Sequence, residues 1–209
     1  MIHRLLDRLA ERYSEREHKL EAMRAREEFF ERAGKVFDDD AELFEGRMAS
    51  FLEWYVLERP TAATGAPPIA GAIASGGGDV LQGAERRVLA ALAATHRSLF
   101  ELHGIADHLL DVEDLVGGAR FAVRERRNPL GMTVGDVFEA RLCWDGEAIV
   151  FGRTFLFHPP DARDVVLDWV QRAVTEGKAR DEILFHLSRQ HVRWHRLGHV
   201  GAAKVYRDA

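Results

Sequence analysis

The first stretch of the chain has a helical pattern of apolar and charged positions. Apolar residues recur every three or four positions, and the charged residues between them have spacings that stabilise an exposed helix face. This pattern predicts one amphipathic helix over residues 2–35, with charged interruptions at Arg16 and Glu27. Such a helix packs on its own domain or pairs with a second copy in a coiled coil. The apolar positions expected to serve self-association are Leu6, Leu9, Tyr13 and Leu20.

Two more helices and a connector are expected before the period changes. Three aspartates at residues 38–40 precede a helical pattern over residues 41–57, and aspartates at this position cap the first N–H groups of a helix. Ala, Gly, Pro, Thr and Ser dominate residues 60–78, which indicates a flexible connector. A further amphipathic helix is predicted from residue 79 to about residue 97.

After residue 98 the spacing between apolar residues shortens from that of a helix to that of a β-strand. Short segments rich in β-branched and aromatic residues alternate with turn signals. The dipeptide Asp145-Gly146 lies between two alternating runs and predicts a tight hairpin. Five strands at this spacing predict a small antiparallel barrel or a strongly curled sheet. The expected strands cover residues 99–105, 109–112, 119–126, 137–144 and 148–157.

Two helices are predicted after the sheet, at residues 161–175 and from about residue 179 to residue 195. The whole pattern predicts an α+β fold in which N-terminal helices precede a small β-domain and C-terminal helices cover it. The expected regions are a helical part (1–59), the connector (60–78), and an α+β domain (79–209) whose barrel spans 98–158 and whose C-terminal helices span 161–200.

The composition indicates a chain that can build a core. Hydrophobic residues make up 46% and charged residues 30% of the 209 residues, which excludes wholesale disorder. No apolar run reaches the roughly 18 residues of a membrane-spanning helix, and no secretory signal is recognisable. The single cysteine, Cys143, permits no internal disulfide and no zinc ribbon. We therefore expect a soluble protein of the reducing cytoplasm that needs no cofactor.

The C-terminal stretch carries the clearest chemical signal. Residues 186–207 hold four histidines and five Arg or Lys residues but no Asp or Glu, although the whole chain has a formal net charge of −5. A cationic, histidine-rich surface suits a phosphate group or an acidic patch of a partner protein. The residues expected to form this anion-binding surface are Arg189, His191, Arg193, His195, Arg196 and His199.

Two other functions of this stretch stay open. Histidines four residues apart can ligate one metal ion, but the Glu of a hydrolase motif is missing between His191 and His195, and neighbouring arginines repel a cation. Nucleic acid is a natural anionic partner, and Trp194 and Tyr206 offer rings for base stacking. Against this function, the chain as a whole is acidic, whereas nucleic-acid modules have a basic excess.

Enzymatic catalysis has little support in the sequence. Cys143 lies in the middle of a predicted strand, where alternation buries it, and no Gly-x-Ser-x-Gly motif is present. The three glycines at residues 76–78 are not followed by the Lys and Ser or Thr of a phosphate-binding loop.

Four segments resemble motifs of a group of poorly characterised bacterial proteins. Residues 51–59 read Phe-Leu-Glu-Trp-Tyr-Val-Leu-Glu-Arg, which is similar to a Phe-x-x-Trp-Phe helix with an acidic-Arg pair. Ser-Leu-Phe-Glu-Leu at 98–102, Asp-Leu-Val-Gly at 114–117 and Gly-Asp-Val-Phe-Glu-Ala-Arg at 135–141 resemble elements of that group's small β-domain. The resemblance implies a helical part followed by a β-domain and no particular reaction. Some members carry a C-terminal SEC-C zinc motif, but its cysteines are absent here, so no zinc is implied.

The leading hypothesis is a non-enzymatic interaction or adaptor module that binds a protein partner. The N-terminal helix would support self-association or docking, and the C-terminal surface would meet an acidic patch. The alternative is a nucleic-acid-binding regulatory protein that uses the same C-terminal surface. A metal-dependent enzyme is the third hypothesis.

Overall fold

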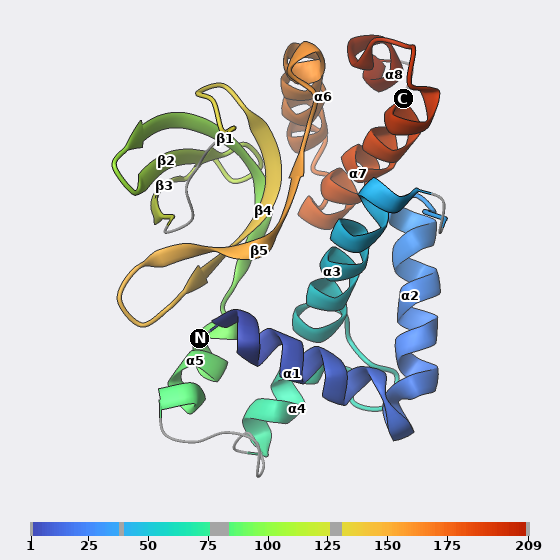
Figure 1. Ribbon diagram of the computed structural model, residues 1–209, viewed down its shortest axis with the longest axis vertical. Helices are drawn as coiled ribbons and strands as arrows, with labels where there is room; N and C mark the ends of the chain where they lie inside the picture. Colours follow the sequence, from blue (N-terminus) through green and yellow to red (C-terminus); the bar gives the residue numbers. More distant parts are fainter. Residues whose placement is uncertain (1, 38–39, 76–83, 126–130, 208–209) are drawn as a thin grey trace.

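The computed structural model describes residues 2–37, 40–75, 84–125 and 131–207. In this part of the chain, eight α-helices and five β-strands form an α+β fold, which confirms the predicted class. Figure 1 shows the sheet beside two groups of helices, one from the N-terminal half of the chain and one from its C-terminal part.

The helices that precede the sheet are α1 (Ile2–Ser14), the short 3-10 helix η1 (Arg16–His18), α2 (Lys19–Ala33), α3 (Ala41–Leu57), α4 (Pro68–Ala74) and α5 (Ala84–Leu92). The strands are β1 (His96–Ala106), β2 (Leu109–Asp114), β3 (Arg120–Arg124), β4 (Val137–Trp144) and β5 (Ile149–Phe157). The helices that follow the sheet are the 3-10 helix η3 (Pro160–Ala162), α6 (Arg163–Thr175), α7 (Arg180–Leu197) and α8 (Ala202–Arg207).

The five strands close into a ring. β1 pairs with β2 and β4, β2 pairs with β3, and β4 pairs with β5 through the predicted hairpin, all antiparallel. A parallel contact between Arg124 of β3 and Val150 of β5 completes the ring. The sheet is therefore mixed, and the prediction of a purely antiparallel sheet is wrong at this pair. The face that the ring encloses is an apolar cluster of Phe100, Leu102, Leu110, Val112, Val123, Phe138, Ala140, Leu142 and Phe151.

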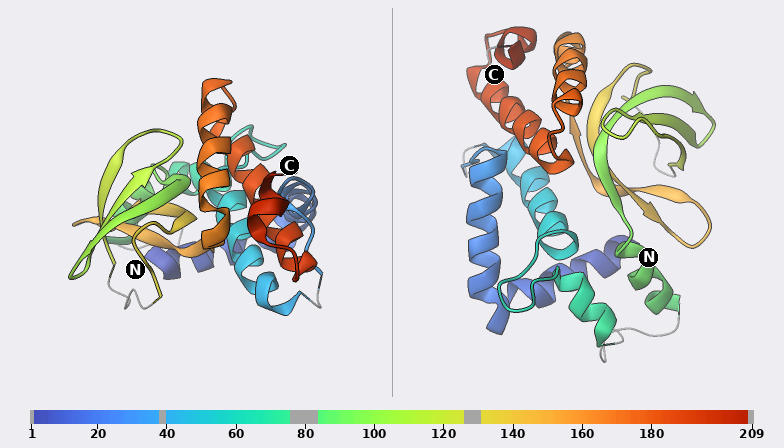
Figure 2. Two further views of the ribbon diagram at one scale, coloured as in Figure 1. Left: turned by 90° about the horizontal axis from the view of Figure 1, so that it is seen from above. Right: turned by 180° about the vertical axis from the view of Figure 1, so that it is seen from behind.

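The outer side of β1 and β4 carries the helices. Along β4, Val137 packs in the C-terminal helical cluster and Cys143 packs in the N-terminal one. Glu139 and Arg141 lie between them, so a polar strip separates two apolar clusters on the same strand. The N-terminal cluster combines residues of α1 to α5 with Phe185 of α7. Both groups of helices lie on the same side of the sheet in the two further views of the ribbon (Figure 2).

The predicted single N-terminal helix is broken between α1 and α2. Arg16 has a positive φ of 51°, and the two helices meet there at a sharp angle (Figure 1). The change of direction alters which positions face the core. Leu6, Leu9 and Tyr13 of α1 are buried in the core of the chain itself. Leu20 of α2 is 70% exposed, so the expected self-association face is not continuous.

The aromatic residues of α3 lie at the centre of the N-terminal core. Phe51, Trp54 and Tyr55 are 0–4% exposed, and the ring centroid of Phe29 lies 5.5 Å from that of Trp54. Phe185 of α7 packs on the same cluster, 5.6 Å from Phe29. Tyr55 also donates its hydroxyl to a carbonyl in the last turn of α1, at 3.0 Å, and so satisfies a group that the helix leaves without a partner.

Part of the predicted flexible connector is helical. Residues 68–74 form α4, which starts with a proline and buries Ile69 and Ala72 in the N-terminal core. Residues 76–78 of the connector and residues 79–83 of the next predicted helix lie outside the described residues. That helix, α5, ends at residue 92, earlier than predicted, because β1 begins four residues later.

The expected capping of α3 by aspartate side chains is wrong at Asp40. Its carboxylate accepts hydrogen bonds from the N–H of Phe37 at 2.9 Å and from Arg196 at 2.8 Å, and not from the first turn of α3. Residues 38–39 lie outside the described residues.

The short helix α8 was not predicted. Among the described residues, no helix combines the length and the apolar composition that a bilayer crossing requires.

Leu9 and Leu20 provide a test of the broken helix. Leu9→Ala should lower the free energy of unfolding by about 2–5 kcal/mol, because it leaves a cavity in a packed core. Leu20→Ala, on the same predicted face, should change it by less than about 0.5 kcal/mol, because that side chain is exposed. Urea unfolding followed by circular dichroism measures both. A loss of oligomeric mass with unchanged stability in Leu9→Ala would support the coiled coil instead.

Candidate functional site: a charged cleft between the sheet and α7

The cationic residues of the C-terminal stretch bind the end of α2. The last carbonyl groups of a helix lack partners within it, and that end of the helix is electronegative. Arg189 of α7 donates to the carbonyl of Arg32 at 2.8 Å. Arg196 donates to the carbonyl of Lys35 at 2.7 Å and to the carboxylate of Asp40. Two of the six predicted anion-binding residues therefore bind groups of the chain itself.

Arg47 of α3 binds the same helix end. It is buried, donates to the carbonyl of Ala33 at 2.7 Å, and bonds the hydroxyl of Ser188 on α7. Burial lowers the pKa of Arg47 to about 10, which leaves it cationic at neutral pH. We call Arg47, Arg189 and Arg196 the arginine clasp, because together they fasten α3 and α7 to the C-terminal end of α2.

The histidines of this stretch do not form one surface. His186 stacks on Trp169 with ring centroids 4.1 Å apart, and burial lowers its pKa. His191 lies 6.2 Å from the ring of His158, and burial lowers its pKa to about 4. His199 lies beyond the end of α7, so His191, His195 and His199 do not share one helix face.

The remaining candidates offer little reactive chemistry. Arg193 is exposed on α7, and His195 is half-buried there. Burial raises the pKa of the Cys143 thiol to about 12, so the thiol stays protonated at neutral pH. In the part of the chain that the structure describes, no three His, Cys, Asp or Glu residues are placed to hold a metal ion.

Two arginines lie side by side on the outer face of the sheet. Arg97 of β1 and Arg141 of β4 are direct cross-strand neighbours, an arrangement that is destabilising unless anions separate the charges. Their side chains are 9% and 2% exposed, so solvent screens them little. Both form ion pairs with the carboxylate of Glu58, next to the end of α3. Nη2 of Arg141 donates a hydrogen bond to it, whereas Nε of Arg97 lies 3.2 Å away without hydrogen-bond geometry.

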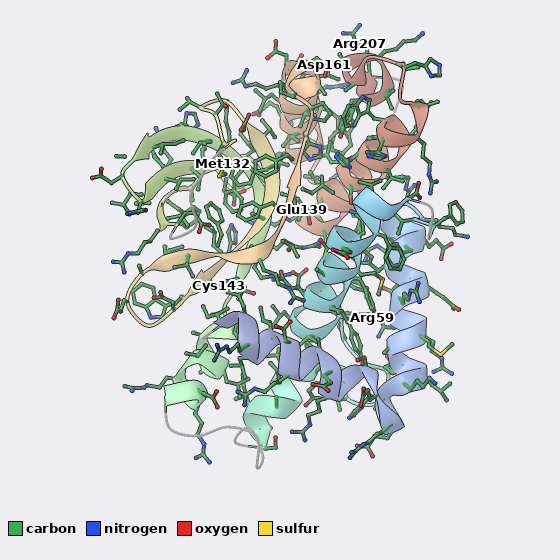
Figure 3. All side chains as sticks on the ribbon, viewed as in Figure 1. Arg59, Met132, Glu139, Cys143, Asp161 and Arg207 are labelled. Atoms are coloured by element: carbon green, nitrogen blue, oxygen red, sulfur yellow. The ribbon has the colours of Figure 1, made fainter. Side chains whose placement is uncertain are left out.

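Further groups complete this charge network, which we define as Glu53, Glu58, Arg97, Glu139 and Arg141. Nε of Arg141 lies 3.4 Å from Glu53 of α3, and Nη1 of Arg97 donates to Glu139 at 3.1 Å. Burial opposes ionisation of Glu58, but the charges of the two arginines outweigh it and lower the pKa of this carboxyl. Figure 3 shows Glu139 where the sheet meets the helices.

Arg97 has hydrogen-bonding capacity that the charge network does not use. Its Nη2 atom is buried and has no hydrogen-bond partner among the described residues. Its guanidinium lies 5.3 Å from the centre of the Phe185 ring. A buried donor without an acceptor costs about 1–3 kcal/mol, and more when it is charged. Arg97 is therefore the member of the network that would gain most from an added acceptor.

Arg97 also lines an open cleft where β1, α3 and α7 meet. This α7 cleft has a volume of about 350 Å³, and six of its seven lining residues are polar. α7 begins in the wall of the cleft, and the N-terminal end of a helix is electropositive. The lining residues are Glu58, Thr95, His96, Arg97, Arg180, Asp181 and Leu184.

Asp114 orients two residues of the cleft wall. It is 1% exposed, accepts a hydrogen bond from Nε2 of His96 at 2.8 Å, and lies 3.5 Å from Nη2 of Arg180. Burial opposes its ionisation, but hydrogen bonds from the Ser98 hydroxyl and from backbone N–H groups of the next turn outweigh it and lower its pKa. A Cβ atom on Gly117 would lie 2.6 Å from Oδ2 of Asp114, so this turn requires glycine.

A second cleft, of about 440 Å³, lies at the turn between β1 and β2. None of its lining residues is buried, and it holds no buried charge comparable to Arg97. The α7 cleft is therefore the better candidate for a specific site. The residues of the second cleft are Ala106, Asp107, His108, Leu109 and Arg124.

Reasoning from the sequence selects none of the residues of the α7 cleft as functional. The available signal is the resemblance, because Glu58, Ser98, Asp114 and Arg141 each belong to a different resembling segment and meet around this cleft. Comparison with known protein families, curated proteins and solved structures finds no match for this chain. Membership of the bacterial group therefore stays a prediction.

Arg141→Met tests whether the charge network holds the sheet to α3. It should lower the free energy of unfolding by about 3–5 kcal/mol, because the buried Glu53 loses its counter-ion and the half-buried Glu58 loses one of two. The control is Arg120→Met, which breaks an exposed pair with Asp111 and should cost less than about 1 kcal/mol. Urea unfolding measures both variants, and equal effects would contradict a structural role of the network.

Proposed function

We propose that the protein is a non-enzymatic interaction module that holds an acidic segment of a partner protein in the α7 cleft. The observation that carries this proposal is Arg97, whose buried Nη2 lacks a partner among the described residues while its side chain lines the cleft. A carboxylate in the cleft would lie beside the cationic guanidinium of Arg97, and charge-assisted interactions of this kind are strong.

The charges around the cleft suit an anion. Arg180 and the backbone N–H groups at the start of α7 add positive potential beside Arg97, and the carboxylate of Glu182 in this turn accepts the N–H of Ala179. The two acids of the wall are already compensated, because Glu58 binds the arginines of the charge network and Asp181 binds Arg32 at 2.6 Å. An incoming carboxylate would therefore be attracted by Arg97 and Arg180, while the nearby acids Glu58 and Asp181 repel it little because arginines already neutralise them.

The lining of the cleft favours a protein partner over a small molecule. Sites for small molecules are enclosed and mostly apolar, with few polar groups. Here the cleft is open, and Leu184 is the one apolar residue among the seven that line it. Such a site suits a charged side chain or chain end whose remaining bulk stays outside and contacts the surface around the cleft.

Two earlier hypotheses lose their structural support. Self-association through α1 is not part of the proposal, because Leu6, Leu9 and Tyr13 are buried in the core of the chain itself. We do not extend the proposal to nucleic acid, because the arginine clasp uses two of the cations on which that alternative rests. The reducing cytoplasm remains the proposed setting, since the single cysteine forms no disulfide.

A labelled hexaglutamate peptide tests the proposal by fluorescence anisotropy. It should bind saturably, while hexaglutamine and hexalysine should not. Arg180→Gln should weaken binding about tenfold, because one charge-assisted contact is lost. Arg97→Lys should also weaken it, since lysine keeps the charge but loses the planar fork of donors. Amide resonances of residues 180–184 should shift during the titration, which would locate the peptide at the cleft.

The matched control is Arg24→Gln, which removes the same charge from an exposed position in the first half of α2, a helix that contributes no residue to the cleft. It should leave peptide binding unchanged within about twofold, because an exposed charge outside the cleft is largely screened by salt. An equal loss in Arg24→Gln and Arg180→Gln, or no saturable binding at millimolar peptide, would contradict a site in the α7 cleft.

A further inference from the structure

A cluster of three rings joins the end of the sheet to the C-terminal helices. His158 follows β5 and is 4% exposed, and its Nδ1 lies 2.8 Å from the hydroxyl oxygen of Tyr206 on α8. The ring of His191 on α7 lies 6.2 Å from that of His158, at an interplanar angle of 79°. This cluster is separate from the α7 cleft, which lies at the opposite end of α7.

Both histidines of the cluster are poorly placed to carry a charge. Nε2 of His158 and Nδ1 of His191 are buried, and neither atom bonds any residue that the structure describes. The charged or titratable groups that face His191 are Arg47 of α3 and His195 of α7, and each opposes a further positive charge. His158 faces His191 and the hydroxyl of Tyr206. A proton on His158 would therefore be a buried charge without a counter-ion, and a proton on the half-buried His191 would lie beside the positive charge of Arg47.

α8 is attached to the rest of the chain at both of its ends. Near its start, the N–H of Ala202 donates to the carboxylate of Asp161 at 2.9 Å, and near its end Tyr206 contacts His158. Asp161 also faces Tyr206, but its carboxylate is engaged by the backbone of α8 and forms no ion pair with an imidazole in the described chain. A helix of six residues is not stable alone, so α8 depends on these contacts and on the burial of Val205.

We propose that α8 is an acid-released latch, in which protonation of His158 and His191 frees α8 from the C-terminal core while the ring of strands stays folded. A protonated imidazole carries N–H donors on both nitrogens, and the buried Nε2 of His158 has no acceptor among the described residues. Release of α8 brings water to the ring and solvates its charge. The ring of strands keeps its own apolar cluster, which contains no residue of α8.

The direction of the pH dependence follows from burial. It lowers the pKa of His158 to about 3 and that of His191 to about 4, both below the ordinary value of a histidine near 6.5. The attached state therefore binds the proton more weakly than the released state. Attachment is fully stable above about pH 6.5 and weakens as the pH falls toward 4 and then 3. Each imidazole that regains water favours release by about tenfold per pH unit in this window.

Hydrogen–deuterium exchange of residues 202–207 in the full chain tests the latch at about pH 7 and about pH 5, after correction for intrinsic exchange rates. Protection of α8 should fall between the two pH values by about thirtyfold for each imidazole that gains water on release. Protection of β1 should fall much less. Loss of protection in α8 and β1 together would mean global unfolding and would overturn the latch, as would protection of α8 that does not change with pH.

Two variants separate the latch from general acid sensitivity. His158→Asn places an amide near the position of Nδ1 without a titrating ring, and should reduce the pH effect on α8 to less than about a fifth. The control, His199→Asn, changes an exposed histidine in the connection to α8 and should leave the effect intact. Tyr206→Phe keeps both histidines and should lower protection of α8 already at pH 7. If His158→Asn does not fold, unchanged protection in Tyr206→Phe would still overturn the latch.

Discussion

The interaction on which the rest of the structure depends is the sharing of one carboxylate by two cross-strand arginines. Arg97 and Arg141 are neighbours on β1 and β4 and have little exposure to solvent. Such a pair of like charges destabilises the fold unless carboxylates bind to both guanidinium groups. Glu53 and Glu58 come from α3 and its end, so α3 must lie across the outer face of the sheet. This requirement fixes the N-terminal helices against the ring and leaves the two apolar clusters on either side of the polar strip.

Much of the fold follows from periodicity. The class, the five strands, the hairpin at Asp145-Gly146 and the buried aromatic side of α3 all rest on local patterns that the tertiary structure reinforces. The break at Arg16 does not follow, because Arg16 and Glu27 interrupt the apolar spacing alike, yet α2 continues through Glu27. The packing of α1 against α3 distinguishes the two positions. The parallel contact of β3 with β5 and the short helix α8 depend on partners distant in sequence, which no local pattern reveals.

The candidate site shows the same limit more strongly. The cationic C-terminal stretch is evident in the sequence. The backbone carbonyls that accept hydrogen bonds from Arg189 and Arg196 have no sequence signal, so the sequence predicts a partner-binding surface where these arginines bind the chain itself. The charge network has the opposite problem. Its five members are scattered along the chain, and each alone resembles an ordinary surface charge, because 88 residues separate Glu53 from Arg141. Their association becomes visible only when the strand register places the two arginines side by side.

The arginine clasp also constrains the order in which this chain can fold during synthesis. The carbonyl of Arg32 receives its donor from Arg189, 157 residues later, and the aromatic core around Phe29 is completed by Phe185. Closing contacts over such separations carries a large entropic cost and occurs late. During synthesis, α1, α2 and α3 therefore leave the ribosome long before α7 has been made. In many multidomain chains the N-terminal part folds first as a complete unit, but here that part still lacks contacts from α7. The N-terminal helices of a nascent chain keep apolar surface and an uncapped helix end exposed until α7 has been translated.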